Sequence, residues 1–329
     1  MTRLTRRGLL GGMVGASVAP LVPASPAFAA APADRAQAPG VYRYKVGDFE
    51  ISAVTDGAAT FSLPDHFVQN HSKPEVQAAL ADYYQPTDTV TIPFTPILIN
   101  TGTKLVLLDT GYGPEMNAKT KGRVGQLPVN LAAAGIDPKA IDTVIISHMH
   151  LDHVSGLRTA DGGIAFPNAE IFVPAPDWAF WMSDAEMNKL PEGYTKSVYP
   201  GIRKTFVGLE NKVTKYEGGK ELVTGITTIA TPGHTPGHMS FAVASGSAKV
   251  LVQSDVTNIP HLFLRNPDWQ VMYDVDPLAA AATRKKFYDM AAAEKALVQG
   301  FHFPFPAAGH VEKRGEQYRL VPIFWNPAI

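Results

Sequence analysis

Cysteine is absent from this sequence of 329 residues. Disulfides, zinc–thiolate sites and cysteine nucleophiles are therefore excluded, and any metal ion must be bound through nitrogen and oxygen atoms. The net charge is only −1 and no basic patch is present, so the sequence gives no electrostatic indication of nucleic-acid binding. A G-x-S-x-G motif is also absent, which excludes the strained serine nucleophile that this motif provides.

Residues 1–29 have the features of an export signal. Arg6 and Arg7 precede a moderately apolar run, and Ala27-Phe28-Ala29 is a small-x-small cleavage site. The arginine pair favours twin-arginine export over a Sec signal or an uncleaved anchor. No later apolar run is long enough to span a bilayer. We expect a periplasmic or secreted protein without a stable membrane anchor after signal cleavage.

The remaining chain is predicted to be a linker at 30–40 followed by a single domain at 41–329. Two strand-rich blocks with flanking helices predict an α+β fold, in which two sheets pack face to face and helices lie outside. A long alanine-rich helix is expected over 277–300, with the basic run that begins at Arg284 on its solvated face. Residues 61–92 show no clear pattern apart from a short helical stretch.

Three histidines and one aspartate are concentrated in the segment SHMHLDHV, residues 147–154. The segment follows a predicted strand at 143–146. On such a loop His148 and His150 can turn to one side, while Asp152 and His153 reach a second point. Metal coordination is the simplest chemistry that explains this crowding.

Three later residues complete a set of metal ligands. His234 lies in a Pro-Gly-His turn after a predicted strand at 226–230, Asp255 ends a strongly apolar strand, and His302 lies beside a proline-containing turn. A carboxylate at the end of a buried strand is costly unless it is paired or bound to a metal. We expect two ions, one held by His148, His150 and His234 and the other by Asp152, His153 and His302, with Asp255 bridging them. The expected ions are two divalent metals, zinc first, with iron, manganese or cobalt as alternatives.

The H-x-H-x-D-H motif, the Pro-Gly-His turn, the strand-end aspartate and the late histidine resemble the metallo-β-lactamase superfamily. The segment LVLLDTG, which contains Asp109, matches the preceding strand motif of that family. The wide gap between His153 and His234 and the segment FPFPAAGHVEKRGEQYRLVP are most similar to the methyl parathion hydrolase group, which is exported, binuclear and related to lactonases and arylesterases. The resemblance covers essentially the whole mature chain and implies an αββα four-layer sandwich.

The resemblance also implies roles for residues that are not ligands. Asp109 is expected to orient ligands without binding metal, and His238 to have a structural or orienting role. His310, a rival to His302, is expected to form only hydrogen bonds. Independently of the resemblance, the apolar side chains of Trp181, Phe180, Leu262 and Phe263 are candidates for a substrate pocket, with burial in the core as the alternative. For Trp181 the resemblance adds that the methyl parathion hydrolase group has an active-site tryptophan in this segment.

The expected reaction is hydrolysis of an ester-type bond by a hydroxide shared between the two metals, with Asp152 and Asp255 as catalytic residues. The expected substrate is a small apolar ester, lactone or phosphotriester such as methyl parathion. A periplasmic β-lactamase is the alternative, although known enzymes of that class lack an aspartate at the bridging position. A catalytically inactive metal-binding protein is a further alternative, and the sequence leaves a homodimer open.

Overall fold

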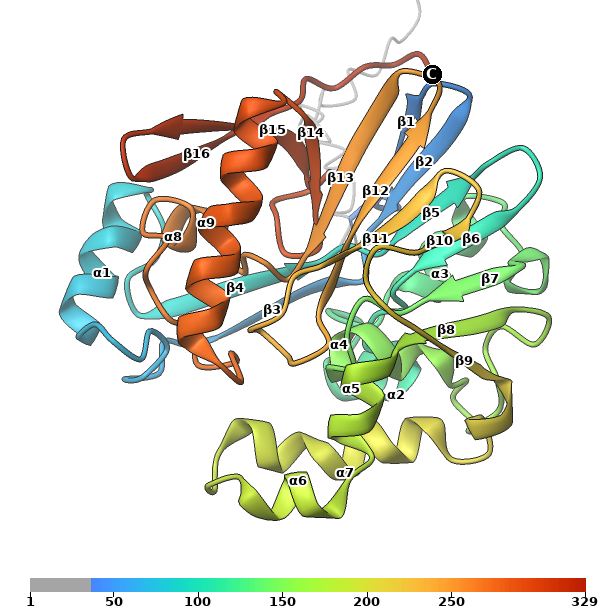
Figure 1. The fold of residues 1–329 in the computed structure, drawn as a ribbon, viewed down its shortest axis with the longest axis horizontal. Coiled ribbons are helices and arrows are strands. Elements are labelled where there is room, and N and C mark those ends of the chain that lie inside the picture. Colours follow the sequence, from blue (N-terminus) through green and yellow to red (C-terminus); the bar gives the residue numbers. More distant parts are fainter. Residues whose placement is uncertain (1–36) are drawn as a thin grey trace, which may run out of the picture. The chain divides into compact units, whose positions relative to one another are not determined.

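Two seven-stranded mixed sheets face each other in the computed structural model, which describes residues 37–329 (Figure 1). The first sheet has the order β1-β2-β5-β6-β7-β8-β9, and its last four strands are parallel. Its strands are β1 Val41–Val46, β2 Phe49–Val54, β5 Ile97–Asn100, β6 Leu105–Leu108, β7 Thr143–Ile145, β8 Glu170–Pro174 and β9 Val213–Tyr216.

The second sheet follows the chain from β10 to β16 without a change of order, and only β13 and β14 are parallel neighbours. Its strands are β10 Glu221–Val223, β11 Ile226–Ala230, β12 Met239–Ser245, β13 Ala248–Ser254, β14 Leu297–Gly300, β15 Ala308–Arg314 and β16 Gln317–Pro322.

The central strands are apolar on both faces because each sheet is covered on both sides. Val106 of β6 and Val250 of β13 point into the core between the sheets, whereas their neighbours Leu107 and Leu251 point to the outer helices. Helices α3 (Leu127–Ala133), α5 (Ala175–Trp181) and α7 (Tyr194–Phe206) cover the first sheet, and α9 (Pro277–Ala293) covers the second. The expected αββα sandwich is therefore confirmed.

A small cap is built from the stretch that the sequence left unassigned. Strands β3 (Gly57–Ser62) and β4 (Thr89–Phe94) form a separate antiparallel hairpin, which packs with α1 (Lys73–Asp82) and α8 (Pro260–Phe263) around its own apolar cluster. The remaining helices are α2 (Gly113–Lys119), α4 (Leu151–Val154) and α6 (Asp184–Lys189).

Two expectations about the last helix are wrong. Helix α9 ends at Ala293, and residues 297–300 form β14. Arg284 is 1% exposed and lies on the inner face of the helix, not on a solvated face.

The predicted signal peptide lies outside the described residues, as does most of the predicted linker. Residues Pro39–Ile329 form one compact unit. Among the described residues no helix is both long enough and apolar enough to cross a membrane.

Candidate binuclear metal site

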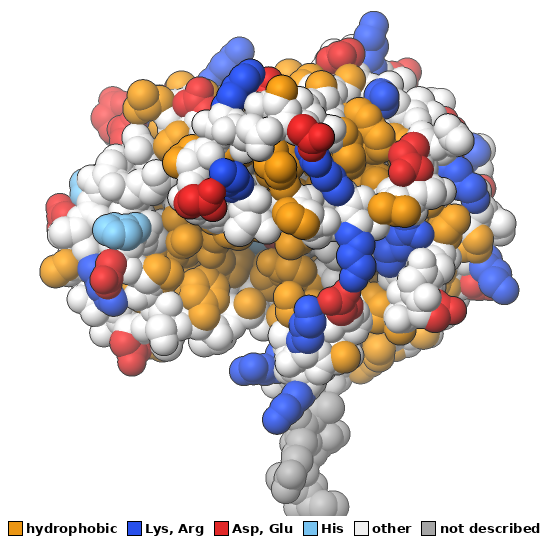
Figure 2. Space-filling model, turned by 90° about the horizontal axis from the view of Figure 1, so that it is seen from below, with side chains coloured by type: hydrophobic (Ala, Val, Ile, Leu, Met, Phe, Trp, Pro, Cys, Tyr) orange, Lys and Arg blue, Asp and Glu red, His pale blue; other side chains and the backbone are white. Residues whose placement is uncertain are grey.

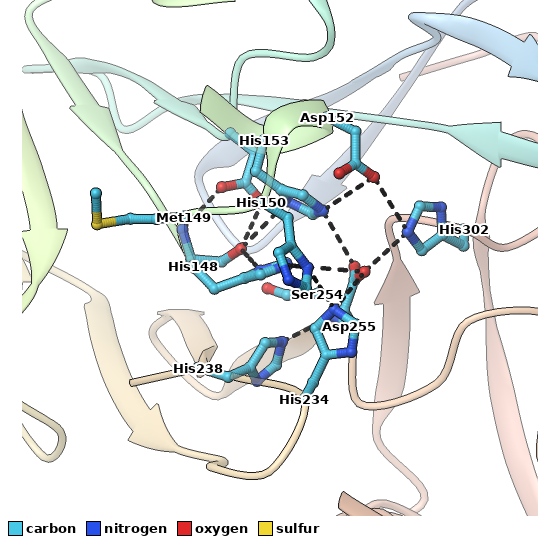
Figure 3. A network of polar contacts seen from close by, with 12 residues as sticks. His148, Met149, His150, Asp152, His153, His234, His238, Ser254, Asp255 and His302 are labelled. Atoms are coloured by element: carbon cyan, nitrogen blue, oxygen red, sulfur yellow. Dashed lines mark hydrogen bonds and ion pairs between the residues drawn. The ribbon is translucent and has the colours of Figure 1, made fainter. Parts of the chain in front are cut away.

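The ends of the strands bring the predicted ligands to one edge of the sandwich (Figure 3). Strands β6 and β7 are parallel, so their carboxyl ends lie side by side, and the histidine motif follows β7 directly. Strands β13 and β14 are also parallel, which places Asp255 beside His302. His234 reaches the same edge from the turn after β11.

Three buried imidazoles form the first ligand cluster. Nδ1 of His150 lies 2.9 Å from Nε2 of His234 and 3.2 Å from Nε2 of His148. Burial lowers the pKa of His148 and of His150 well below the usual range, and the neighbouring imidazoles lower it further. Both rings are therefore neutral, which is the form that binds a metal ion.

Asp152, His153 and His302 form the second cluster together with Asp255. Nε2 of His302 lies 2.8 Å from Oδ2 of Asp255 and 3.5 Å from Oδ2 of Asp152. Nε2 of His153 lies 3.4 Å from Oδ1 of Asp255 and 3.5 Å from Oδ2 of Asp152. Two imidazole nitrogens and two carboxylates thus converge from separate elements.

Asp255 contacts both clusters. Its Oδ2 atom also lies 3.4 Å from Nε2 of His234 and 3.9 Å from Nε2 of His148. Burial alone would raise the pKa of this carboxyl, but His302 and His153 hold it well below its usual range. An ionised carboxylate between the two clusters has the position that a bridging ligand requires.

Asp109 orients two of the histidines from behind. Its Oδ2 atom accepts hydrogen bonds from the Ser147 hydroxyl at 2.7 Å and from Nδ1 of His153 at 2.8 Å. Because the hydroxyl proton of Ser147 is donated to Asp109, the Ser147 oxygen accepts from Nδ1 of His148 at 3.1 Å. The Nε2 lone pair of each histidine is then left for the cluster, as the resemblance implied for the role of Asp109.

Two further oxygens set the remaining ring orientations. Nδ1 of His234 donates to Oδ1 of Asp274 at 2.8 Å, and Nδ1 of His302 donates to the carbonyl of Pro93 at 2.8 Å. Asp274 was not singled out in the sequence, because it lies 40 positions beyond His234 and no motif connects them.

These donor atoms fit two divalent cations. His148 and His234 both present an Nε2 lone pair to His150, whose single N–H can serve only one of them. Nε2 of His153 and Oδ1 of Asp255 are buried and have no hydrogen-bond partner among residues 37–329. Buried polar atoms are rarely left unpaired, so a cation in each cluster accounts for them. In each group the possible ligand atoms lie within 4.8 Å of one another. The first group is His148, His150 and His234, and the second is Asp152, His153, Asp255 and His302.

His238 supports the site without facing either cluster. The backbone N–H of Asp255 donates to its Nε2 atom at 3.0 Å, so this nitrogen is an acceptor that is already used. Nδ1 therefore carries the proton and donates to the carbonyl of Thr231 at 3.0 Å. Burial lowers the pKa of His238 to about 3, and the ring stays neutral. His310 is exposed and bonds only to backbone carbonyls near β14.

Two residues next to the ligand clusters have a strained backbone conformation. Asp109 and Ser254, at the ends of β6 and β13, have φ angles of 61° and 52°. Non-glycine residues in this region cost about 1–3 kcal/mol and persist only where the surroundings impose them. Gly233, with φ 133°, has no Cβ because one would collide with the backbone of Ala280 in α9.

Asp177 joins the two ligand-bearing loops and was missed in the sequence. Its side chain is fully buried and accepts hydrogen bonds from the backbone N–H of Met149 at 2.8 Å and of Gly237 at 2.6 Å. Trp181 donates its indole N–H to the same carboxylate at 3.3 Å. Met149 lies between two ligands of the motif, and Gly237 lies in the turn after His234.

Replacing Asp177 by alanine should lower the free energy of unfolding by about 3 kcal/mol, because two buried backbone N–H groups would lose their acceptor. Urea unfolding of the metal-free proteins measures this loss. Asp65→Ala is the control, because the side chain of Asp65 is 77% exposed. An Asp177→Ala midpoint equal to that of the control would show that the carboxylate does not hold the loops.

A cavity of about 100 Å³ opens above the two clusters. Aromatic and aliphatic side chains of the cap hairpin form one wall, and tyrosines and an asparagine form the others. The face of the molecule seen from below is hollowed at its centre, where hydrophobic side chains gather (Figure 2). In addition to the ligands His150, Asp152, His234, Asp255 and His302, the cavity is lined by Ala59, Phe61, Ile92, Phe94, Tyr112, Tyr194, Asn258 and Tyr273.

The four side chains predicted to line a substrate pocket do not line this cavity. Leu262 and Phe263 are fully buried in the cap cluster, and Phe180 packs against the outer core of the first sheet. Trp181 is fully buried behind His150, with the ring centroids 5.5 Å apart. Aromatic side chains on the inner face of a helix bury most area by facing the core, and here that preference prevails.

The family comparison agrees with this arrangement. The family model described as the metallo-beta-lactamase superfamily matches residues 95–302, a range that contains every predicted ligand. The chain belongs to this superfamily. It is a hydrolase of the metallo-beta-lactamase fold, as its two facing sheets also show.

Relatives within the superfamily include lactonases. N-acyl homoserine lactonase AttM of Agrobacterium fabrum (strain C58) is 31% identical over 149 residues, which are 43% of this chain and 48% of AttM. N-acyl homoserine lactonase AiiA of Bacillus thuringiensis subsp. kurstaki is 28% identical over 65% of this chain and 82% of its own length. The solved structure of AidC, a dizinc quorum-quenching lactonase, superposes with a TM-score of 0.81 at 26% identity, covering 88% of this chain and 99% of AidC. The match to AttM thus spans about half the length of that relative.

Proposed function

We propose that the protein hydrolyses lactones or closely related uncharged esters with two divalent metal ions. The observation that carries the proposal is the position of Asp255 between two complete ligand clusters, directly beneath a cavity with aromatic walls. The similarity to three lactonases, one of them a dizinc enzyme, supports zinc and a lactone substrate.

Two bound cations would supply a water activated near neutral pH and a Lewis acid for the substrate carbonyl. The chain's own groups supply the proton chemistry around them. Asp152 is 7% exposed and lines the cavity, so its carboxylate can hold the proton that the attacking water gives up. Burial raises the pKa of Tyr112, Tyr194 and Tyr273 above the usual value. Each phenol therefore keeps its proton and remains a hydrogen-bond donor to a substrate oxygen.

The charge of the cavity favours an uncharged substrate. No lysine or arginine lines it among the described residues. A β-lactam carries a carboxylate in addition to the bond that is cleaved, and apart from the two metal ions, which would bind the water and the carbonyl, the lining residues offer that carboxylate no cation. A lactone or a phosphotriester carries no such charge, and both can be polarised by a metal ion. We rank the lactone first because the lactonase relatives support it, and the phosphotriester second.

The rates of the zinc- and cobalt-loaded protein on three substrates test the proposal. An acyl-homoserine lactone, methyl parathion and a chromogenic cephalosporin should be compared by kcat/KM. The lactone should give the highest value, methyl parathion a lower one, and the cephalosporin no turnover above background. Turnover of the cephalosporin alone would overturn the proposal in favour of a β-lactamase.

Phe61 on β3 provides a test of the cavity wall. Phe61→Ala removes apolar area that contacts the substrate in both ground and transition states, so KM should rise by about tenfold with kcat little changed. Steady-state kinetics on the preferred substrate measure both constants. Phe324→Ala is the control, because Phe324 is 95% exposed and outside the cavity lining. An unchanged KM would place the substrate elsewhere.

A further inference from the structure

Arg284 is a buried cation that the proposed chemistry does not use. It is 1% exposed on α9, whereas the next residue, Lys285, forms an ion pair with Asp268 at the surface. Removing a guanidinium from water costs several kcal/mol unless it is paired and hydrogen-bonded. The groups that contact the guanidinium therefore indicate which part of the structure it stabilises.

All the hydrogen bonds of Arg284 go to one segment of backbone. Nε donates to the carbonyl of Val256 at 2.9 Å, and Nη1 donates to the carbonyls of Pro267 and Trp269 at 2.8 Å each. Val256 directly follows Asp255, so the guanidinium anchors the chain one residue from the shared ligand. The anchored segment also carries Asn258, which lines the cavity.

A second connection leads from Arg284 to His234. Nη2 of Arg284 lies 3.7 Å from Oδ2 of Asp274, and Oδ1 of Asp274 accepts the Nδ1 proton of His234 at 2.8 Å. The backbone N–H of Val275 also donates to the carbonyl of His234 at 3.0 Å. Oδ2 of Asp274 is buried and has no hydrogen-bond partner among the described residues, so the guanidinium supplies its nearest compensating charge.

We propose that Arg284 is a positioning residue of the metal site, which it controls through Asp274 and through the carbonyl of Val256. The guanidinium holds the carboxylate of Asp274 in the position that faces His234, and it fixes the chain that carries Asp255. The first cluster depends on the Asp274 connection through His234, and both clusters share Asp255. Asp152, His153 and His302 make no hydrogen bond or ion pair with Arg284 or Asp274 among the described residues. This inference rests on the proposed binuclear site, but not on the identity of the substrate.

Metal titration of variants tests the proposal. Cobalt binding to Arg284→Met, Arg284→Lys and Asp274→Asn is followed by visible absorption and by competition with a chromogenic chelator. We expect one of the two ions to bind about 10–100-fold more weakly in each variant, with a changed absorption band, because partners of metal-bound histidines have effects of this size. The double variant Arg284→Met/Asp274→Asn should lose less than the sum of the two single losses. Lys285→Met, on the same helix, is the control and should match the wild type.

A purely structural role gives a different result. If Arg284→Met and Arg284→Lys lower the free energy of unfolding but bind both ions with wild-type affinity and spectrum, the proposal is wrong. If Arg284→Met does not fold, Arg284→Lys and Asp274→Asn decide, because both keep the size of the side chain. Wild-type protein that binds two ions but does not hydrolyse lactones would refute the proposed function and leave this inference standing.

Discussion

Asp255→Ala should bind at most one metal ion tightly and lose at least about 1,000-fold in kcat/KM. The loss corresponds to about 4 kcal/mol of transition-state stabilisation. Its physical reason is that Asp255 is the only residue whose carboxylate faces both clusters among the described residues, with Oδ2 near His234 and His302 and Oδ1 near His153. Without its negative charge, two cations a few ångströms apart repel each other unscreened. Metal analysis after gel filtration and steady-state kinetics measure the two effects.

The control for this variant is Asp82→Ala, which removes a surface carboxylate that is 57% exposed and paired with Arg265. It should retain both ions and wild-type turnover. Asp255→Ala protein with two tightly bound ions and undiminished turnover would contradict the bridging role and the binuclear mechanism with it.

Removal of metal should abolish hydrolysis and lower the melting temperature by about 5 °C or more. Ligands that bind only the folded state stabilise it by about 2.7 kcal/mol at a hundredfold excess over Kd, and a chain of this size gains a few degrees per kcal/mol. The seven clustered ligands are all buried, so the unfolded chain cannot offer the same site. Calorimetry and activity before and after treatment with a chelator measure both losses.

Restoration by different ions sharpens this test. Zinc or cobalt should restore both properties because the site offers five imidazoles and two carboxylates. Calcium should restore neither, since it requires six to eight oxygen ligands. Equal restoration by calcium, or a melting temperature that does not respond to the chelator, would argue against the nitrogen-rich metal site.

The metal site was readable from the sequence because its ligands have local signatures. The H-x-H-x-D-H spacing needs no knowledge of the fold, and His234 and Asp255 each follow a strand that the sequence already indicated. His302 was recognised beside its proline-containing turn, although the strand before it, β14, was predicted as the end of a helix. The supporting residues have no such signature. Asp177 accepts hydrogen bonds from the backbone N–H groups of Met149 and Gly237, which are 28 and 60 positions away in the sequence. Only the packing of α5 brings the three residues together.

The burial of Arg284 was indicated by its position in the helical pattern, but its charge favoured the opposite prediction. Arg284 stands four positions after Ala280 and three before Phe287, which is the spacing of one helix face, and both neighbours are buried. The basic run Arg-Lys-Lys favoured a solvated face instead. Periodicity was the better guide here, because a guanidinium can be buried once backbone carbonyls and a carboxylate surround it.

Two features of the fold could not be predicted for reasons of local chemistry. Helix α9 ends at Ala293, and the left-handed position that follows it, with φ 49°, is taken by Lys295 and not by glycine, so its boundary with β14 carries no usual stop signal. The cap hairpin contains the weak strand GAATFS and a proline in β4, and its paired residues lie 27 or more positions apart in the sequence. Because that hairpin forms one wall of the cavity above the ligand clusters, the sequence did not indicate which residues line that cavity.

Anomalous diffraction from crystals of the zinc-loaded protein tests the central claim most directly. We expect two zinc peaks about 3.5–4 Å apart. One should lie among His148, His150 and His234, the other among Asp152, His153 and His302, with the carboxylate of Asp255 touching both. A single peak, or two peaks with Asp255 turned away from them, would contradict the central claim.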